Sequence, residues 1–151
     1  METPSPASPL RFLIVTLCGR YLALDAESIC GLLTFEEAGN VENPMIHGIM
    51  YGAINLADRL GLPDDQGDTN THVLLLSERE ARGSVRVTTV EGLLELSLSQ
   101  VLPIPMQFRG PERHWYRGMI LVAKSIALVL NTSWVFNEEG PAKRGSGDVV
   151  V

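Results

Sequence analysis

The sequence predicts an all-β protein in which short strands close into small barrels. Short apolar runs and segments of alternating apolar and polar residues recur along the chain, separated by turn residues. Helical periodicity is confined to a few brief segments. Because a closed barrel removes exposed sheet edges, many short strands favour barrels over an open sheet. The chain has 151 residues, 45% hydrophobic and 20% charged, which suits a globular protein with a core.

The first third of the chain predicts a hairpin followed by shorter elements. Residues 11–17 (RFLIVTL) and 20–25 (RYLALD) are two strands joined by a turn that contains Gly19. Asp25 then caps a short helical turn. Residues 45–54 (MIHGIMYGAI) read as one strand, and residues 55–61 (NLADRLG) as a short helix. In that helix Asn55 is the N-cap, Leu56 and Leu60 share one face, and Gly61 is the stop.

The remaining strands follow in pairs. Residues 72–78 (HVLLLSE) and 83–90 (GSVRVTTV) form one pair, and Val85 and Val87 alternate with polar residues as in a half-buried strand. Residues 91–97 (EGLLELS) add a further strand. The last pair, GMILVA and SIALVLN, is joined by a tight turn near Lys124, and NTSWVFNEE predicts a C-terminal helix.

Both ends of the chain differ in composition from the middle. Residues 1–10 are rich in Pro and Ser, and residues 138–151 are rich in Gly with mixed charge. We expect a flexible leader, one folded domain over residues 11–137 and a flexible tail.

Composition excludes several classes of partner. Twelve Lys plus Arg against 18 Asp plus Glu give a net charge of −6, so nucleic acid is not expected as a partner. The apolar runs are too short to span a bilayer, and the first residues do not form a secretory signal. The two cysteines, Cys18 and Cys30, cannot build a disulfide framework. We therefore expect a cytoplasmic protein without membrane insertion.

No motif predicts catalysis or a cofactor. The three histidines, His47, His72 and His114, lie outside any pattern that couples them to a nucleophile or a metal. The Gly48–Gly52 pair lacks the Lys and Ser/Thr of a phosphate loop. The pairs Glu36–Glu37 and Asp64–Asp65 are typical of solvated charge, and DDQGD offers too few ligands for calcium. HWYRG (114–118) could be a binding hot spot or could fill a barrel end.

The order of these segments resembles the CheW family, the adaptors that couple chemoreceptors to the CheA histidine kinase in bacteria. FLIVTLCGRYLALDAESICGLL is similar to the family's first hairpin and following turn. IHGIMYGAINLADRLG is an ungapped counterpart of its Leu-Arg-Gly stretch. ARGSVRVTTVEGLLEL and YRGMILVAKSIALVLNTSWVF resemble its middle strand pair and its final hairpin and helix.

This resemblance implies two packed five-stranded SH3-like β-barrels with a few short helices and no catalytic activity. In the family, receptor signalling tips dock in the groove between the barrels, and the kinase's regulatory domain docks against one barrel end. Carried over by position, the groove residues are Ile29, Leu32, Ile46, His47, Val87 and Val90. The five apolar ones among them could equally belong to the core.

Departures from the family pattern are concentrated on the kinase-facing side. His47 replaces the family's Arg and loses its permanent charge and bidentate fork. Gly52 replaces a Pro, Asn55 an Asp and Thr88 a further Asp, and the connection between Leu32 and Ile46 is shortened. The chain thus resembles abbreviated, FrzB-like members of the family from gliding bacteria. We expect an adaptor in receptor arrays that keeps the receptor contact and has weakened or lost the kinase contact.

Three alternatives remain open at this point. The chain could be an ordinary coupling protein that bridges the receptor and the kinase, and it could also associate with paralogous CheW-like proteins. It could instead be an unrelated small β-barrel that binds a ligand or a nucleic acid, because barrels of this kind host many functions. An enzyme is the third and weakest alternative.

Overall fold

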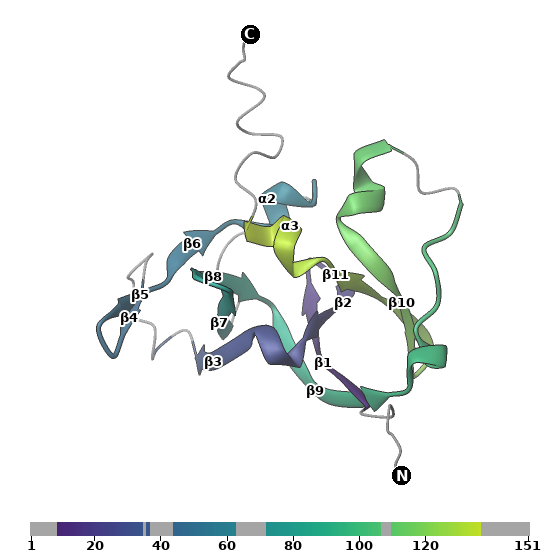
Figure 1. The fold of residues 1–151 in the computed structure, drawn as a ribbon, viewed down its shortest axis with the longest axis horizontal. Coiled ribbons are helices and arrows are strands. Elements are labelled where there is room, and N and C mark those ends of the chain that lie inside the picture. Colours follow the sequence, from purple (N-terminus) through teal and green to yellow (C-terminus); the bar gives the residue numbers. More distant parts are fainter. Residues whose placement is uncertain (1–8, 35, 37–43, 63–71, 107–109, 137–151) are drawn as a thin grey trace, which may run out of the picture.

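A computed structural model describes residues 9–34, 36, 44–62, 72–106 and 110–136 of the chain. It is mostly β, as predicted, with its strands in two main sheets (Figure 1). The first sheet has five strands in the order β10-β11-β2-β1-β9. Its members are β1 (Leu10–Leu17), β2 (Arg20–Asp25), β9 (Thr89–Leu96), β10 (Tyr116–Val122) and β11 (Ser125–Leu130).

The second sheet has four strands in the order β3-β7-β8-β6, and a separate two-stranded hairpin is formed by β4 and β5. The strands are β3 (Ile29–Thr34), β4 (Met45–Ile46), β5 (Ile49–Met50), β6 (Gly52–Ile54), β7 (His72–Glu78) and β8 (Ala81–Val87). The helices are short: η2 (Ala26–Ser28), α2 (Leu56–Arg59), η4 (Leu98–Gln100), η5 (Gly110–His114) and α3 (Thr132–Phe136). None of the described helices has the length and hydropathy needed to cross a bilayer.

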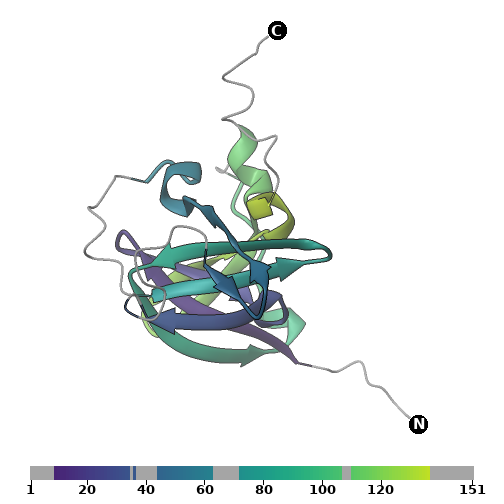
Figure 2. The same ribbon diagram turned by 90° about the vertical axis from the view of Figure 1, so that its left-hand side faces the viewer.

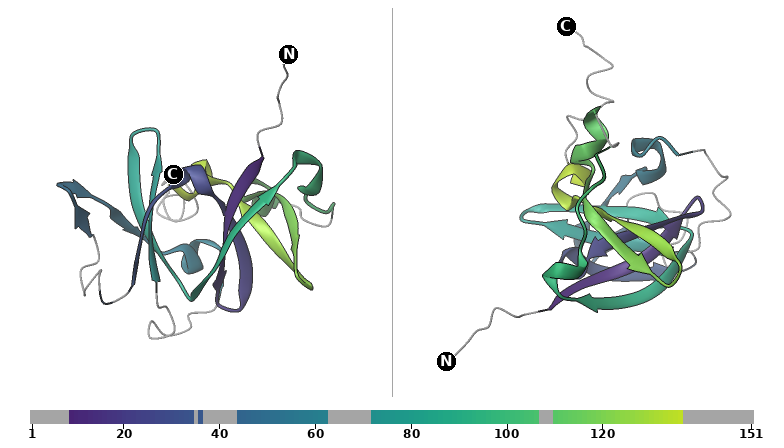
Figure 3. Two further views of the ribbon diagram at one scale, coloured as in Figure 1. Left: turned by 90° about the horizontal axis from the view of Figure 1, so that it is seen from below. Right: turned by 90° about the vertical axis from the view of Figure 1, so that its right-hand side faces the viewer.

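The two sheets form two packed units, which confirms the predicted fold class. Seen from below, they lie side by side and are joined where β8 runs into β9 (Figure 3). In the first unit, Leu102 and Met119 exchange two backbone hydrogen bonds of 2.8 Å each, so the segment after β9 returns to the outer edge of β10. Helices α2 and α3 lie at the same end of the sheets (Figure 2).

Several local predictions are confirmed. The β1–β2 turn places Cys18 and Gly19 at φ of 53° and 81°, the left-handed conformation that tight hairpin turns require. Asp25 accepts a hydrogen bond from the Glu27 N–H at 3.0 Å and so caps η2. Asn55 accepts one from the Asp58 N–H at 3.0 Å and caps α2.

Residues 45–54 do not form the single strand that the sequence suggested. His47 and Gly48 have φ of 53° and 80°, so the chain turns there and β5 pairs back on β4. Only residues 52–54 then join the second sheet, as β6 parallel to β8. The His-Gly pair is a hairpin signal that the apolar residues around it conceal.

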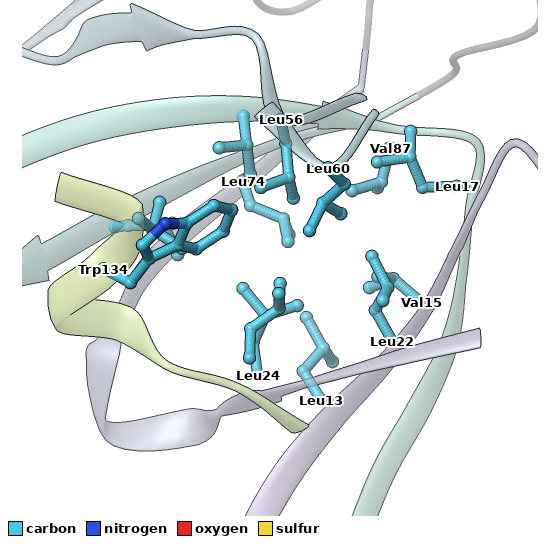
Figure 4. Close-up of a cluster of buried hydrophobic side chains, with 14 of the residues drawn as sticks. Leu13, Val15, Leu17, Leu22, Leu24, Leu56, Leu60, Leu74, Val87 and Trp134 are labelled. Carbon is cyan, nitrogen blue, oxygen red and sulfur yellow. The ribbon is translucent and has the colours of Figure 1, made fainter. Parts of the chain in front are cut away.

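One hydrophobic core is shared by both units. Alternate residues of β1 and β2 point from the first sheet toward Leu74 and Val87 of the second, and α2 and α3 close the same space (Figure 4). The side chains that meet there include Leu13, Val15, Leu22, Leu24, Leu56, Leu60 and Trp134. Smaller clusters cover the opposite faces of the two sheets. The central core therefore fixes how the units sit against each other.

The predicted chain ends are outside the described residues, which begin at residue 9 and stop at residue 136. The leader, the tail and the domain limits of 11–137 therefore stay predictions, although β1 already begins at Leu10. The end of the predicted C-terminal helix after Phe136 and the Asp64–Asp65 pair also lie outside the described residues.

Candidate functional site

Three of the predicted groove residues share the side of the sheets on which the units meet. Ile29 and Leu32 pair with Leu76 and Leu74 of β7, whose side chains belong to the central core. Since directly paired residues of a sheet share a face, Ile29 and Leu32 are on the face turned toward the first sheet. On that sheet, Val90 of β9 pairs with Val15 of the central core.

These three residues lie at the margin of the core and not in its middle. Ile29 and Val90 are half-buried and pack against the central core from different sheets. Leu32 is 45% exposed. β3 is an end strand of its sheet, so no described strand covers its outer edge. We call Ile29, Leu32 and Val90 the inter-sheet surface.

Val87 belongs to the core and not to this surface. Its side chain is 0% exposed and packs with Leu17, Leu74 and Val85 in the central cluster. Of the two locations that the sequence left open for Val87, the structure therefore supports the core.

Ile46 and His47 lie away from the inter-sheet surface. Ile46 packs with Leu33 against Tyr51, Val73 and Leu75, a cluster on the opposite face of the second sheet. His47 is exposed in the β4–β5 turn.

Around His47 the hairpin presents exposed apolar side chains that sequence reasoning missed, namely Met45, Ile49 and Met50. With His47 they form what we call the β4–β5 surface. The signal that could have found it is the His-Gly pair itself, because a turn there brings the flanking apolar residues out of a buried strand.

Gly52 and Asn55 are two further positions that depart from the family, and of these Asn55 has a local role and Gly52 has no structural explanation. A Cβ at Gly52 would meet no atom within 4 Å beyond the two neighbouring residues, so close packing does not require a glycine at this position. Asn55 holds the first turn of α2, and Leu56 and Leu60 then reach the core. Only His47 of these three positions lies on the β4–β5 surface.

The aromatic motif HWYRG contributes to the interior. The Trp115 ring stacks on the Trp134 ring of α3, with centroids 5.3 Å apart and planes at 23°. Tyr116 is buried in the central core. The arrangement favours the barrel-end interpretation of this motif over a binding hot spot.

The titratable groups of the described part are dispersed. No group of three or more His, Cys, Asp or Glu side chains there could hold a metal ion. The Cys30 Sγ lies 3.7 Å from the Tyr51 Oη and 3.4 Å from the Leu75 carbonyl oxygen. The hydrogen bond with the Cys30 thiol, together with burial, raises the pKa of Tyr51. Such an arrangement supplies apolar contact surfaces.

Comparison with known proteins agrees with this arrangement. The model of the CheW-like domain family matches residues 11–140. A search of curated proteins found no match. Among solved structures, the scaffolding protein TtCheW from Thermoanaerobacter tengcongensis is similar with a TM-score of 0.71 and 12% identity. The match covers 89% of this chain and 97% of that one. At this identity the likeness shows the fold, two packed SH3-like β-barrel units.

Proposed function

Because this chain belongs to the CheW-like family, we propose that it is a non-catalytic adaptor of bacterial chemosensory signalling that binds the signalling tip of a chemoreceptor. The tip binds at the inter-sheet surface, where Leu32 supplies an exposed apolar contact and Ile29 and Val90 supply half-buried ones. Receptor tips lie on the cytoplasmic side of the membrane, so the adaptor acts there, in receptor arrays.

One observation carries this proposal. Leu32 stays 45% exposed although its paired residue, Leu74, is fully buried in the core. A large apolar side chain left exposed on an end strand that no described strand covers is typical of a contact site, since burying it against a partner is favourable. Ile29 and Val90 pack against the central core, so their part of the surface is preorganised.

We further propose that contact with the CheA-type kinase is weakened or lost. The family's kinase-facing side uses the connection before Leu-Arg-Gly, and here only ten residues separate Thr34 from Met45. The Arg of that motif is His47. Because a few residues carry most of an interface's affinity, loss of an Arg hot spot costs about 2 kcal/mol or more, which is over tenfold in Kd.

Direct binding to the isolated regulatory domain of a CheA-type kinase tests this second part. The wild-type protein should bind more weakly than micromolar, and a variant with the family's longer connection and His47→Arg should gain binding. A matched variant, His72→Arg, changes a histidine outside the β4–β5 surface and should gain nothing. Micromolar or tighter binding by the wild type, or kinase activation in a reconstituted receptor assay, would establish an ordinary coupling protein.

One observation favours the alternative that this chain is an ordinary coupling protein. Met45, Ile49 and Met50 remain exposed on the β4–β5 surface, and apolar residues there could still contact a kinase or a paralogous CheW-like protein. Met50→Ser discriminates between the two, because it should lower kinase affinity only if this surface binds the kinase.

A further inference from the structure

A second exposed apolar surface lies at the tip of the β10–β11 hairpin. Leu121 is 65% exposed and Ile126 is 52% exposed. They are direct cross-strand partners, so their side chains share one face of the hairpin. Met119 pairs with Leu128 one step further along that face, and both are half-buried. We call Met119, Leu121 and Ile126 the β10–β11 surface.

Along β11, one face carries core residues at one end and exposed residues at the hairpin tip. Leu128 packs against the central core, whereas Ile126, two residues earlier on the same face, faces solvent. β10 is an end strand of the first sheet, and three strands separate it from β9, which carries Val90 of the inter-sheet surface (Figure 1). In the described part of the chain, Leu102 is the one residue that pairs with the outer edge of β10, and its partner there is Met119.

The surroundings of the β10–β11 surface are basic, in contrast to the chain as a whole. Arg20 and Lys124 are exposed near the tip, and Arg117 is exposed near the start of β10. The parallel register of Ala127 with Tyr21 places Arg20 beside Ile126. The segments 116–130 and 12–24, which form most of β10, β11, β2 and β1, contain no Asp or Glu, although the chain carries a net charge of −6. Burial raises the pKa of Tyr116 at the start of β10, and the acid that acts on this region, Glu112 of η5, raises it further. The surface therefore combines apolar contact area with a cationic border.

We propose that the β10–β11 surface binds an amphipathic helix of another protein, with Asp and Glu bordering its apolar stripe. Apolar residues at i, i+3, i+4 and i+7 of such a helix cover Leu121 and Ile126, while its carboxylates face Arg20, Arg117 and Lys124. Addition of a strand is disfavoured because Leu102 already bonds to the outer edge of β10 at Met119. Association of two identical β10–β11 surfaces is disfavoured because like charges would face each other.

Fluorescence anisotropy tests this with a labelled helical peptide that carries leucines at the four stripe positions and glutamates elsewhere. The full chain should bind it, and the double variant Leu121→Thr/Ile126→Thr should lose about tenfold or more in affinity. Lys124→Glu should weaken binding, and salt at about 1 M should do the same. Leu93→Thr is the matched control, because Leu93 is also 65% exposed but lies on β9, and it should bind as the wild type does.

Circular dichroism should report an unchanged fold for each variant, since all the altered side chains are exposed; Lys124→Glu tests the surface alone if the double variant unfolds. Absence of binding, or equal binding by the double variant, would overturn the proposal. A wild-type dimer in analytical ultracentrifugation that the double variant abolishes would also overturn it, in favour of a second copy. The inference does not depend on receptor binding, and the double variant should bind a receptor tip normally.

Discussion

The guanidinium of Arg59 lies over the indole ring of Trp134, 4.4 Å from its centroid. Arg59 ends α2, and its Nη1 also donates a hydrogen bond to the Val135 carbonyl oxygen of α3. In a second hydrogen bond, the Ser133 Oγ of α3 donates to the Glu78 carboxylate of β7. The C-terminal helix, which follows the first sheet directly, is thereby held to elements of the second.

Arg59→Ala should lower the free energy of unfolding by about 2 kcal/mol, because it removes a cation–π contact and a charge-assisted hydrogen bond. Arg59→Lys should recover part of that loss, since an ammonium lacks the planar guanidinium. Guanidinium chloride unfolding followed by tryptophan fluorescence is the measurement, because both tryptophans of the chain lie in this stack. Arg11→Ala, at an exposed position of β1, is the control. Equal stability of all three variants would mean that α3 is held by the core alone.

Val87→Asp should destabilise the fold strongly, whereas Leu32→Asp should have little effect on stability. The first places a charge at a fully buried site and should cost at least about 3 kcal/mol of stability, or prevent folding. The second changes a side chain that is 45% exposed and should leave the melting temperature nearly unchanged. Thermal melts by circular dichroism distinguish them. A stable Val87→Asp protein would contradict the burial of that residue.

Asn55→Ala should cost about 1 kcal/mol, because the Asp58 N–H loses its cap. Asn55→Asp restores the family's residue and should stay within about 0.5 kcal/mol of the wild type, since a carboxylate caps as well and favours a helix N-terminus. Urea unfolding measures both. If Asn55→Ala costs nothing, packing of Leu56 and Leu60 alone positions α2.

Stability should decline in alkaline solution. Burial raises the pKa of Tyr116 above 10.0, Glu112 raises it further, and Arg20 opposes the shift. A raised folded-state pKa means that the stabilising contribution is complete below pH 10 and is lost as the pH rises from there through the folded-state value. Tyr116→Phe should therefore show a shallower loss of stability above pH 10 than the wild type. Parallel curves in urea unfolding across this range would contradict the assignment.

Local patterns in the sequence predicted much of the fold, because strand periodicity and turn chemistry act over a few residues. The β1–β2 turn at Gly19 and the caps Asp25 and Asn55 are of this kind. Two features were missed. The hairpin at His47 needs a non-glycine residue at positive φ, which apolar periodicity does not reveal. The Arg59–Trp134 contact joins segments far apart in the chain, and no local signal specifies such a pair.

The candidate site was only partly predictable for a related reason. Ile29, Leu32 and Val90 became candidates through their position in the segments that resemble the family. Alternation in a strand tells only which residues share a face. It does not tell which face of a sheet meets the other unit. The structure puts Ile46 on the opposite face of the second sheet and encloses Val87 in the core. Sheet packing, which sequence periodicity leaves open, separates these residues from the surface.

Receptor binding at the inter-sheet surface is tested most directly by isothermal titration of the protein with a soluble fragment of a chemoreceptor signalling tip. The wild type should give a saturable heat of binding, and the folded Leu32→Asp variant should bind at least about tenfold more weakly, because a charge would be buried in the contact. Leu121→Thr, distant from this surface, should bind normally. No heat from folded wild-type protein, or unchanged affinity of Leu32→Asp, would contradict the proposed receptor contact.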